Sequence, residues 1–428
     1  MNKLSYILLV MFAFTTASSL AQGFDEKFTD RTLRLDYIFS GNKTRQEISL
    51  ADAYSIPRWY GKRQRLDETP VEGNGRITVR PHGSEEVIYC NSFSTLFQEW
   101  LTYDEAAGPS RAFENVFLVP MPKDSADITV ELYDNRRRTV AAYTHTVAPG
   151  DILIKHIGEH HITPYATLQQ AANRSRCIRI AFVAEGYRKE EMNVFLDDAK
   201  SAMDAIFAHE PFKTSKDRFN IIAVMPESKD SGTSQPAKGL WRTTALGSHF
   251  DTFYSSRYLT TLNLRRLHDA LAGTPYEHII ILVNTAEYGG GGILNSYVLT
   301  AAHNAQSKPV VVHEFGHSFG GLADEYAYES EQIPMYPLDV EPWERNITTL
   351  KDFHGKWEDM ITKGTPVPTP AVTGRGAGSV IGLYEGAGYS LKGIYRSTED
   401  CRMRSNDTPE FCPVCQKALQ DLIDFYTK

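Results

Sequence analysis

Two histidines and a glutamate in the segment VVVHEFGHSFGGLADEY (residues 310–326) have the spacing of a metal site. Residues four apart lie on one face of a helix, so the imidazoles of His313 and His317 can reach one point. A catalytic zinc site has three protein ligands and one position open to water. Glu314 is placed to take a proton from that water while an amide is hydrolysed. We therefore predict one Zn²⁺ per chain bound by His313 and His317, with Glu314 as general base and acid.

The same spacing also arises by chance in helices whose histidines face solvent. Here three valines at 310–312 precede the motif, so the helix is expected to enter a core. A glutamate and two histidines at the edge of a core are costly unless they serve a partner. This context favours a metal site over a solvated histidine pair.

The third ligand must come from beyond the helix, which Gly320 and Gly321 are expected to end. In the metzincin pattern, HExxHxxGxx is followed directly by a ligand, and Ala323 occupies that position here. Alanine cannot bind a metal. Asp324, one residue later, is our first candidate, and Glu325 is the second. A glutamate on a later helix, as in thermolysin-like enzymes, is the third, and the simplest alternative is a solvated pair of loop carboxylates.

Composition excludes some classes of protein. The chain has 428 residues, enough for two or three domains, and 42% of them are hydrophobic. The formal net charge of −8 argues against nucleic acid as a partner, because a nucleic-acid binder has a basic surface. A protein or glycoprotein substrate remains compatible with these numbers.

The first residues, MNKLSYILLVMFAFTTASSLAQG, have the layout of a secretory signal peptide. Lys3 precedes an apolar stretch at 6–14, and small residues lead to Ala21, after which cleavage is expected. The alternative is an uncleaved anchor, but the apolar stretch is short against the ~20 residues of a membrane span. We predict a signal peptide at 1–21 and an exported protein, periplasmic, cell-surface or secreted, without a transmembrane anchor after its removal.

Three of the five cysteines cluster near the C-terminus as C-x10-C-x2-C. Export favours a disulfide from Cys401 to Cys412 or Cys415. A zinc knuckle would need a fourth ligand, and none lies close by in the sequence. A redox motif at CPVC lacks the βαβ context that would support it.

The fold class predicted is α+β / α/β. Residues 22–147 carry short alternating or β-branched runs separated by turn residues, which predicts an N-terminal β-sandwich domain. Residues 148–174 are expected to be a linker. From 175 to 428, runs such as CIRIAFVAEGY and HIIILVN alternate with segments of helical periodicity. This alternation predicts a mostly parallel sheet beside the HExxH helix.

Several separated segments resemble the IgA peptidase family of bacterial zinc metallo-endopeptidases. They include IAFVAEGYRKEEMNVFLDDA, ILVNTAEYGGGG, the HExxH segment and YEGAGYSLKGIYRSTEDCRMRSNDTPEFCPVC. In the N-terminal part, LFQEWLTYDEA and VPMPKDSADITVELYDNRRR are similar to the domain often fused to these peptidases. The resemblance spans nearly the whole chain after the signal peptide.

The resemblance implies a secreted, metzincin-like zinc peptidase. His313 and His317 would be ligands, Glu314 the catalytic acid and base, and Asp324 the third ligand. Met403 would belong to a Met-turn beneath the metal, although periodicity alone favours an ordinary core methionine. The departure at Ala323 leaves Asp324 and Glu325 as alternatives.

Other residues have weaker signals. The glycine run at 289–292 is either a tight turn or a strand edge to which an extended substrate adds. Tyr326, Tyr389 and Tyr395 are chemically suited to stabilise an oxyanion, and the sequence does not choose among them. His303 is expected at the surface.

Three functions are compatible with these observations. The leading hypothesis is a zinc endopeptidase acting on proteins or glycoproteins outside the cytoplasm. A binding module for glycan or protein with a degenerate or structural metal site is the alternative, but an intact glutamate beside the histidines argues against it. A zinc enzyme that cuts another amide, such as a peptidoglycan cross-link, is the third.

Overall fold

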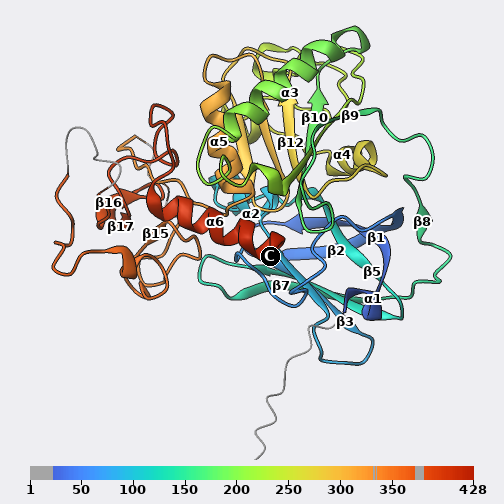
Figure 1. The fold of residues 1–428 in the computed structure, drawn as a ribbon, viewed down its shortest axis with the longest axis horizontal. Helices are drawn as coiled ribbons and strands as arrows, with labels where there is room; N and C mark the ends of the chain where they lie inside the picture. The colour runs from blue at the N-terminus through green and yellow to red at the C-terminus, as the bar shows by residue number, and fades with distance from the viewer. Residues whose placement is uncertain (1–22, 331–332, 334, 372–379) are drawn as a thin grey trace, which may run out of the picture.

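The fold, a computed structural model, is described for residues 23–330, 333, 335–371 and 380–428, and it mixes helices with four sheets (Figure 1). The signal peptide predicted at 1–21 lies outside the described residues. Two four-stranded sheets come first in the chain, and a six-stranded sheet with helices and a small three-stranded sheet follow.

The N-terminal part consists of two sheets with the strand orders β5-β1-β2-β8 and β4-β3-β6-β7. All strand pairs in them are antiparallel except β2 with β8. The elements are α1 (Phe24–Lys27), β1 (Phe28–Gly41), β2 (Gln46–Pro57), β3 (Gly75–Pro81), β4 (Tyr89–Phe93), α2 (Leu96–Trp100), β5 (Arg111–Pro122), β6 (Ala126–Tyr133), β7 (Thr139–Val147) and β8 (Lys155–His156). In β6, ADITVELY, buried and half-buried residues alternate, as in a strand with one face in a core.

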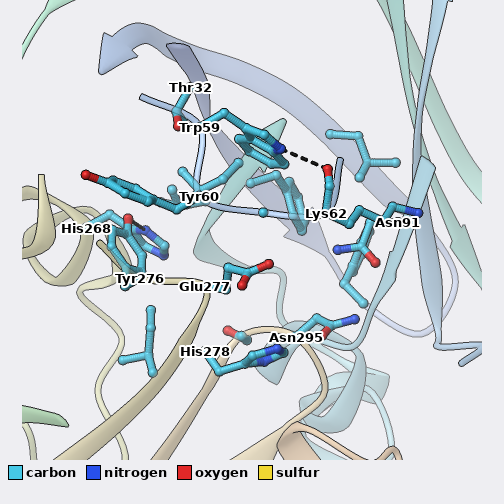
Figure 2. A pocket seen from close by; sticks show the side chains of 18 of the residues that line it. Thr32, Trp59, Tyr60, Lys62, Asn91, His268, Tyr276, Glu277, His278 and Asn295 are labelled. Carbon is cyan, nitrogen blue, oxygen red and sulfur yellow. Dashed lines mark hydrogen bonds between the residues drawn. The ribbon is translucent and has the colours of Figure 1, made fainter. Parts of the chain in front are cut away.

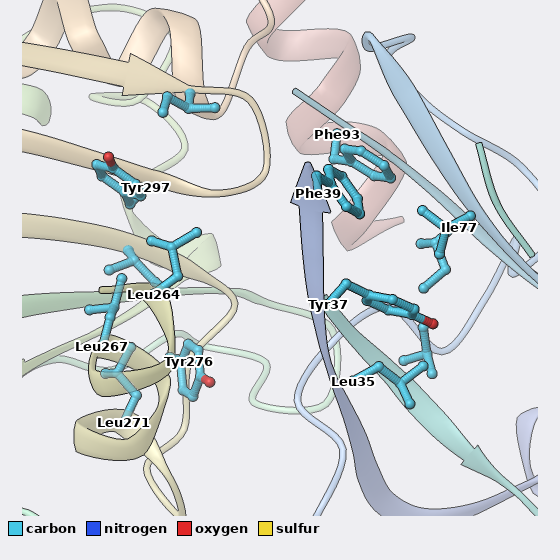
Figure 3. Packing of buried hydrophobic residues seen from close by; sticks show 14 of the residues in the cluster. Leu35, Tyr37, Phe39, Ile77, Phe93, Leu264, Leu267, Leu271, Tyr276 and Tyr297 are labelled. Atoms are coloured by element: carbon cyan, nitrogen blue, oxygen red, sulfur yellow. The ribbon is translucent and has the colours of Figure 1, made fainter. Parts of the chain in front are cut away.

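The two N-terminal sheets enclose one apolar core. Phe39 of β1 and Phe93 of β4 lie with their ring centroids 6.2 Å apart, and Ile77 of β3 belongs to the same cluster (Figure 3). The outer side of β1 is also covered, because Arg34 donates to Asp269 of α4 over 2.6 Å. The N-terminal sheets are therefore packed firmly against the second part of the chain.

The second part is built on a sheet with the order β13-β14-β12-β10-β11-β9. The four inner strands are parallel, and β13 and β9 are antiparallel to their neighbours. Its elements are β9 (Tyr165–Gln169), β10 (Ile178–Glu185), α3 (Met192–Ile206), β11 (Phe219–Val224), α4 (Leu264–Leu271), β12 (His278–Val283), β13 (Gly290–Ile293), β14 (Tyr297–Ala301), α5 (Ser307–Ser318) and α6 (Pro413–Thr427).

Both faces of this sheet are covered, which explains why β12, HIIILV, is buried throughout. Ile280 and Leu282 belong to the same core cluster as residues of α3, α5 and α6. Ile279 and Ile281 belong to the cluster that contains α4 and the N-terminal sheets. The helix with the HExxH sequence thus lies on the face opposite α4 (Figure 1).

The segment expected as a linker, 148–174, contributes a strand to each part. It provides β8 to the first N-terminal sheet and β9 to the edge of the six-stranded sheet. Between α5 and α6 the chain forms a small sheet of β15 (Ile347–Thr348), β17 (Ser390–Arg396) and β16 (Tyr384–Ala387). Among the described residues, no helix has the length and apolar character needed to cross a membrane.

Candidate metal centre

Helix α5 carries His313, Glu314 and His317 and is held in place by its apolar face. Pro309 lies in its first turn, where a backbone N–H has no partner within the helix. Val312 and Phe315 are buried in the core beneath the sheet. The two histidines are half-buried on another face of the helix.

The glycines after α5 perform two different tasks. Gly321 has a φ of +59°, a left-handed conformation that reverses the chain, and its N–H donates to His317 O over 3.0 Å. At Gly320, a Cβ would lie 2.6 Å from Leu419 Cδ2, so the absence of a side chain lets α6 pack closely. The reversed chain then passes back beneath the histidines.

Ala323, at the position where the metzincin pattern has a ligand, is buried in a small cluster with Ile347 and Ala387. Asn346 holds the backbone here: its Oδ1 accepts from Ala323 N, and its Nδ2 donates to Ala323 O, both over 2.8 Å. The next side chain, Asp324, therefore faces the histidines instead.

His313, His317 and Asp324 converge on one point. The two Nε2 atoms are 3.0 Å apart, and Asp324 Oδ1 lies 3.1 Å from His313 Nε2 and 3.3 Å from His317 Nε2. Ligand atoms bound at ~2.0–2.1 Å to a tetrahedral zinc are separated by about 3.3–3.4 Å. The side chains remain 12–17% exposed, which leaves one side of the point open. This donor set fits a metal ion with an open position.

Backbone carbonyls orient both imidazoles. His313 Nδ1 lies 3.0 Å from Arg402 O, and His317 Nδ1 lies 2.6 Å from Leu322 O. A carbonyl oxygen can only accept, so each Nδ1 carries the hydrogen and each Nε2 presents its lone pair to the shared point. Such outer contacts are usual for metal-binding histidines.

The ionisable side chains at the centre shift one another's pKa values. Burial alone would raise the pKa of Asp324, but the charges and hydrogen bonds of His317 and His313 outweigh it and lower that pKa. Burial alone would lower the pKa of His317, and Asp324 reverses this and raises it to about 9. A cation bound at this point would take the place of the proton that Asp324 favours on His317. Burial raises the pKa of Glu314, against the opposing effect of the two histidines.

Two of the three candidate tyrosines lie beside the centre. Tyr389 donates its hydroxyl to Asp324 Oδ2 over 2.6 Å, and Tyr326 Oη lies 3.0 Å from Tyr389 Oη. Tyr395 is in β17, opposite Thr348 of β15, and packs against the large core. The structure thus separates Tyr395 from the other two.

A carboxylate of the N-terminal part also interacts electrostatically with the centre. Glu99 of α2 accepts a hydrogen bond from Tyr258 over 2.5 Å. Burial raises the pKa of Glu99 to about 7, and the negative charges of Glu314 and Asp324 add to that increase. Sequence reasoning did not select Glu99, because nothing local to LFQEW relates it to a helix more than 200 residues later.

Glu325, the second candidate for third ligand, faces the other way. Its Oε1 accepts from Asn346 Nδ2 over 2.9 Å and lies 3.1 Å from Cys415 Sγ. All five cysteines are among the described residues, and all are free, so the disulfide expected from Cys401 is wrong for this structure. The Sγ atoms of Cys401 and Cys415 are 3.8 Å apart. Glu325 belongs with the cysteines and not with the histidines.

A cavity lies at the junction of the two parts, away from this centre (Figure 2). Trp59 and Tyr60 of the N-terminal part line it opposite Tyr276 and Glu277. Its lining includes none of the four residues predicted to bind metal or catalyse. This cavity and the candidate chemistry are therefore in different places.

Comparison with known families decides the class of protein. Residues 166–375 and 372–423 match the family IgA Peptidase M64, and residues 23–144 match the family Peptidase M64 N-terminus. The chain belongs to the IgA peptidase M64 family. It is a metallopeptidase. The resemblance stated from the sequence is confirmed, and the M64 match contains His313, Glu314, His317 and Asp324.

Among solved structures, this M64 peptidase is similar to the crystal structure of metalloproteinase-II from Bacteroides fragilis. The identity is 11%, the likeness covers 67% of this chain and 81% of the other, and the TM-score is 0.22. A score this low supports no argument about the site. No curated protein matches the chain.

Proposed function

We propose that this M64 peptidase is a secreted zinc-dependent endopeptidase that hydrolyses peptide bonds of extracellular proteins or glycoproteins. The proposal rests chiefly on one observation: two imidazole nitrogens and a carboxylate oxygen converge within 3.0–3.3 Å of one another beside Glu314. Two histidines with one carboxylate form a donor set that suits zinc in a hydrolase. Asp324, rather than Glu325, is the third ligand in this proposal.

When bound there, zinc would polarise the substrate carbonyl and acidify a water molecule. The chain's own residues do the rest. Glu314 takes the proton from the attacking water on its carboxylate and returns it to the nitrogen of the leaving amine. The raised pKa of Glu314 suits this role, because a base that must later act as an acid should hold its proton moderately well. Tyr389, which donates to Asp324, holds that carboxylate in the orientation that faces the histidines.

The glycine-rich strand β13 is the proposed substrate-binding edge. It is one of the two edge strands of the six-stranded sheet in the described part of the chain. At Gly292, a Cβ would lie 2.3 Å from Glu314 O, so the strand can run close to α5 only without a side chain there. An extended substrate that adds to β13 as a further strand would pass beside Glu314. Such backbone pairing does not depend on the identity of the substrate's side chains.

The proposal includes a metzincin-like arrangement of the loop beneath the metal. Met403 is fully buried, and its Sδ lies where a Cβ on Gly316 of α5 would come within 2.6 Å. Arg402, its neighbour, provides the carbonyl that accepts from His313. This loop supports the helix from below, as a Met-turn does in the family that the sequence resembles. Export is proposed on the signal-peptide pattern of residues 1–21 alone.

The test measures zinc content and proteolysis together, on wild-type protein and Glu314→Gln. The substitution preserves the size of the side chain but removes the base. We expect unchanged metal at the histidine centre and a loss of ~10²–10⁴-fold in cleavage of a panel of glycoproteins. Equal cleavage by both proteins would contradict the role of Glu314. Absence of nitrogen- and oxygen-bound zinc in the wild type would contradict the zinc mechanism and favour a binding module.

A further inference from the structure

We infer that the chain holds a second, structural zinc ion, bound by Cys401, Cys412, Cys415 and Glu325. One donor atom from each of these residues lies within 4.8 Å of all the others. The four residues come from three separate places: the loop before Met403, the start of α6, and the irregular segment after α5. The sequence alone shows three cysteines and no fourth ligand, and folding adds Glu325. This inference does not depend on the proposed function.

The spacing of the sulfur atoms fits zinc. Thiolates bound at ~2.3 Å to a tetrahedral zinc are separated by about 3.8 Å. Cys401 Sγ and Cys415 Sγ are 3.8 Å apart, and Cys415 Sγ lies 3.1 Å from Glu325 Oε1. Three thiolates with one carboxylate are a soft donor set that selects zinc over calcium or magnesium.

The donors are already oriented by hydrogen bonds to sulfur. Cys401 Sγ accepts from Met403 N over 3.4 Å and from Cys412 N over 3.3 Å. Cys412 Sγ accepts from Cys415 N over 3.4 Å and lies 3.2 Å from Ser397 Oγ. N–H groups directed at sulfur stabilise the thiolate form that binds a metal.

The surroundings explain why a cation belongs here. The four residues are at most 2% exposed, and Glu325 Oε2 has no hydrogen-bond partner among the described residues. An unpaired buried carboxylate oxygen is costly. Three thiolates, a carboxylate and Zn²⁺ sum to a charge of about −2. Arg396 and Arg402, both buried, interact electrostatically with Glu325 and Cys401 respectively and offset that charge.

Burial on all sides assigns the ion a structural role. A catalytic zinc keeps a position open to water, whereas a structural zinc is closed by four protein ligands. The ion would tie α6 to the loop of Arg402 and Met403, which orients His313 and supports α5. It would also anchor the residue directly after Asp324. The second zinc thus stabilises the geometry of the first.

The experiment uses the full chain with His317→Ala, which disables the histidine centre and leaves all four proposed ligands intact. Zinc content is measured by mass spectrometry and the coordination shell by X-ray absorption. We expect two zinc ions in the wild type and one in the variant, the latter with a sulfur-dominated shell at about 2.3 Å. No zinc in the folded variant, or a shell of nitrogen and oxygen alone, overturns the inference.

Two further variants localise the ion. Cys415→Ser should lower zinc content by one per chain, whereas Cys177→Ser, at an isolated buried cysteine, should leave it unchanged. Mass spectrometry of the alkylated wild-type protein should find Cys401, Cys412 and Cys415 all as thiols, and a disulfide among them overturns the inference. A wild type with one sulfur-bound zinc and no proteolysis would support this site while contradicting the proposed function.

Discussion

Asp324 and Glu325 are consecutive carboxylates with opposite surroundings. Asp324 faces two imidazoles at a centre that is open on one side, with side chains 12–17% exposed. Glu325 faces three cysteine sulfurs in a region that solvent does not reach. In an extended segment, successive side chains point in opposite directions, so a single stretch of chain can supply a ligand to each centre. Two adjacent residues therefore belong to two different centres: Asp324 to the one proposed for catalysis and Glu325 to the one proposed for stability.

Chelation should separate the two centres most clearly. A strong chelator reaches the partly exposed histidine centre first, so we expect complete loss of peptidase activity while the fold is retained. Zinc bound by the buried cysteines should leave more slowly, because its release requires local unfolding. Activity, zinc content and circular dichroism followed over time would check this, with added zinc restoring activity. If activity and structure were lost at the same time, the proposed difference between an accessible histidine centre and a buried cysteine centre would be contradicted.

Substitution of Asp324 should have the next largest effect. In Asp324→Asn, the anionic ligand is lost while the shape of the side chain is kept. We expect kcat/KM to fall by about 10²–10⁴-fold, the equivalent of several kcal/mol of lost metal-centred stabilisation. The free energy of unfolding should change little. The measurement is steady-state kinetics beside urea denaturation, and a stability loss larger than the catalytic loss would reverse the assignment.

The substitution of the neighbouring residue, Glu325→Gln, should lower stability more than activity, which is the reverse of the effect expected for Asp324→Asn. Loss of one ligand from a buried metal site is among the few mechanisms that destabilise a protein strongly, so we expect a cost on the order of 3 kcal/mol. Below the melting temperature, the folded fraction should keep activity within about tenfold of the wild type, since an indirect effect on a metal is smaller than removal of its ligand. Denaturation and kinetics on the same preparation test both halves. A stable but inactive variant would show that Glu325 acts in catalysis.

The substitution with the smallest expected effect removes the tyrosine hydroxyl that holds Asp324. Tyr389→Phe removes the donor to Asp324 Oδ2, and loss of such an outer contact typically costs ~10–100-fold in metal affinity or activity. Tyr395→Phe is the matched control, because Tyr395 lies in β17 without that contact. We expect the control to behave like the wild type in zinc titration and kinetics. Equal defects in both variants would assign Tyr389 a purely structural role.

Much of the architecture follows from local pattern. Strands alternating with helical periodicity correctly indicated the parallel strands β10, β11 and β12. The continuous apolar run of β12 is typical of a strand covered on both faces, which is how the structure has it. Short alternating runs indicated the β-rich N-terminal part. Local pattern did not reveal that the segment 148–174 pairs with both parts, because edge strands as short as β8 carry little sequence signal.

The candidate site, too, could be predicted from the sequence only in part. Helical spacing was enough to predict that His313 and His317 share a face, and the structure brings them together with Asp324. Spacing ranked Asp324 before Glu325 but kept both as candidates, since both residues have suitable chemistry one position apart. The contacts of Asn346 and the burial of Ala323 decide which side chain turns toward the histidines. The expectation of a disulfide failed because the sequence does not show that a carboxylate stands beside the three cysteines.

The sequence by itself determined the elements whose physics is local: the helix with two histidines one turn apart, the glycines that end it, and the buried strands beside it. It also carried enough of the M64 pattern to identify the class of enzyme. Only the tertiary structure decided which distant groups complete each centre, such as Arg402 O behind His313, Tyr389 beside Asp324, and the cysteines around Glu325. The reason is that ligand sets depend on the directions of side chains after long loops close, and a change of one residue in register reverses those directions.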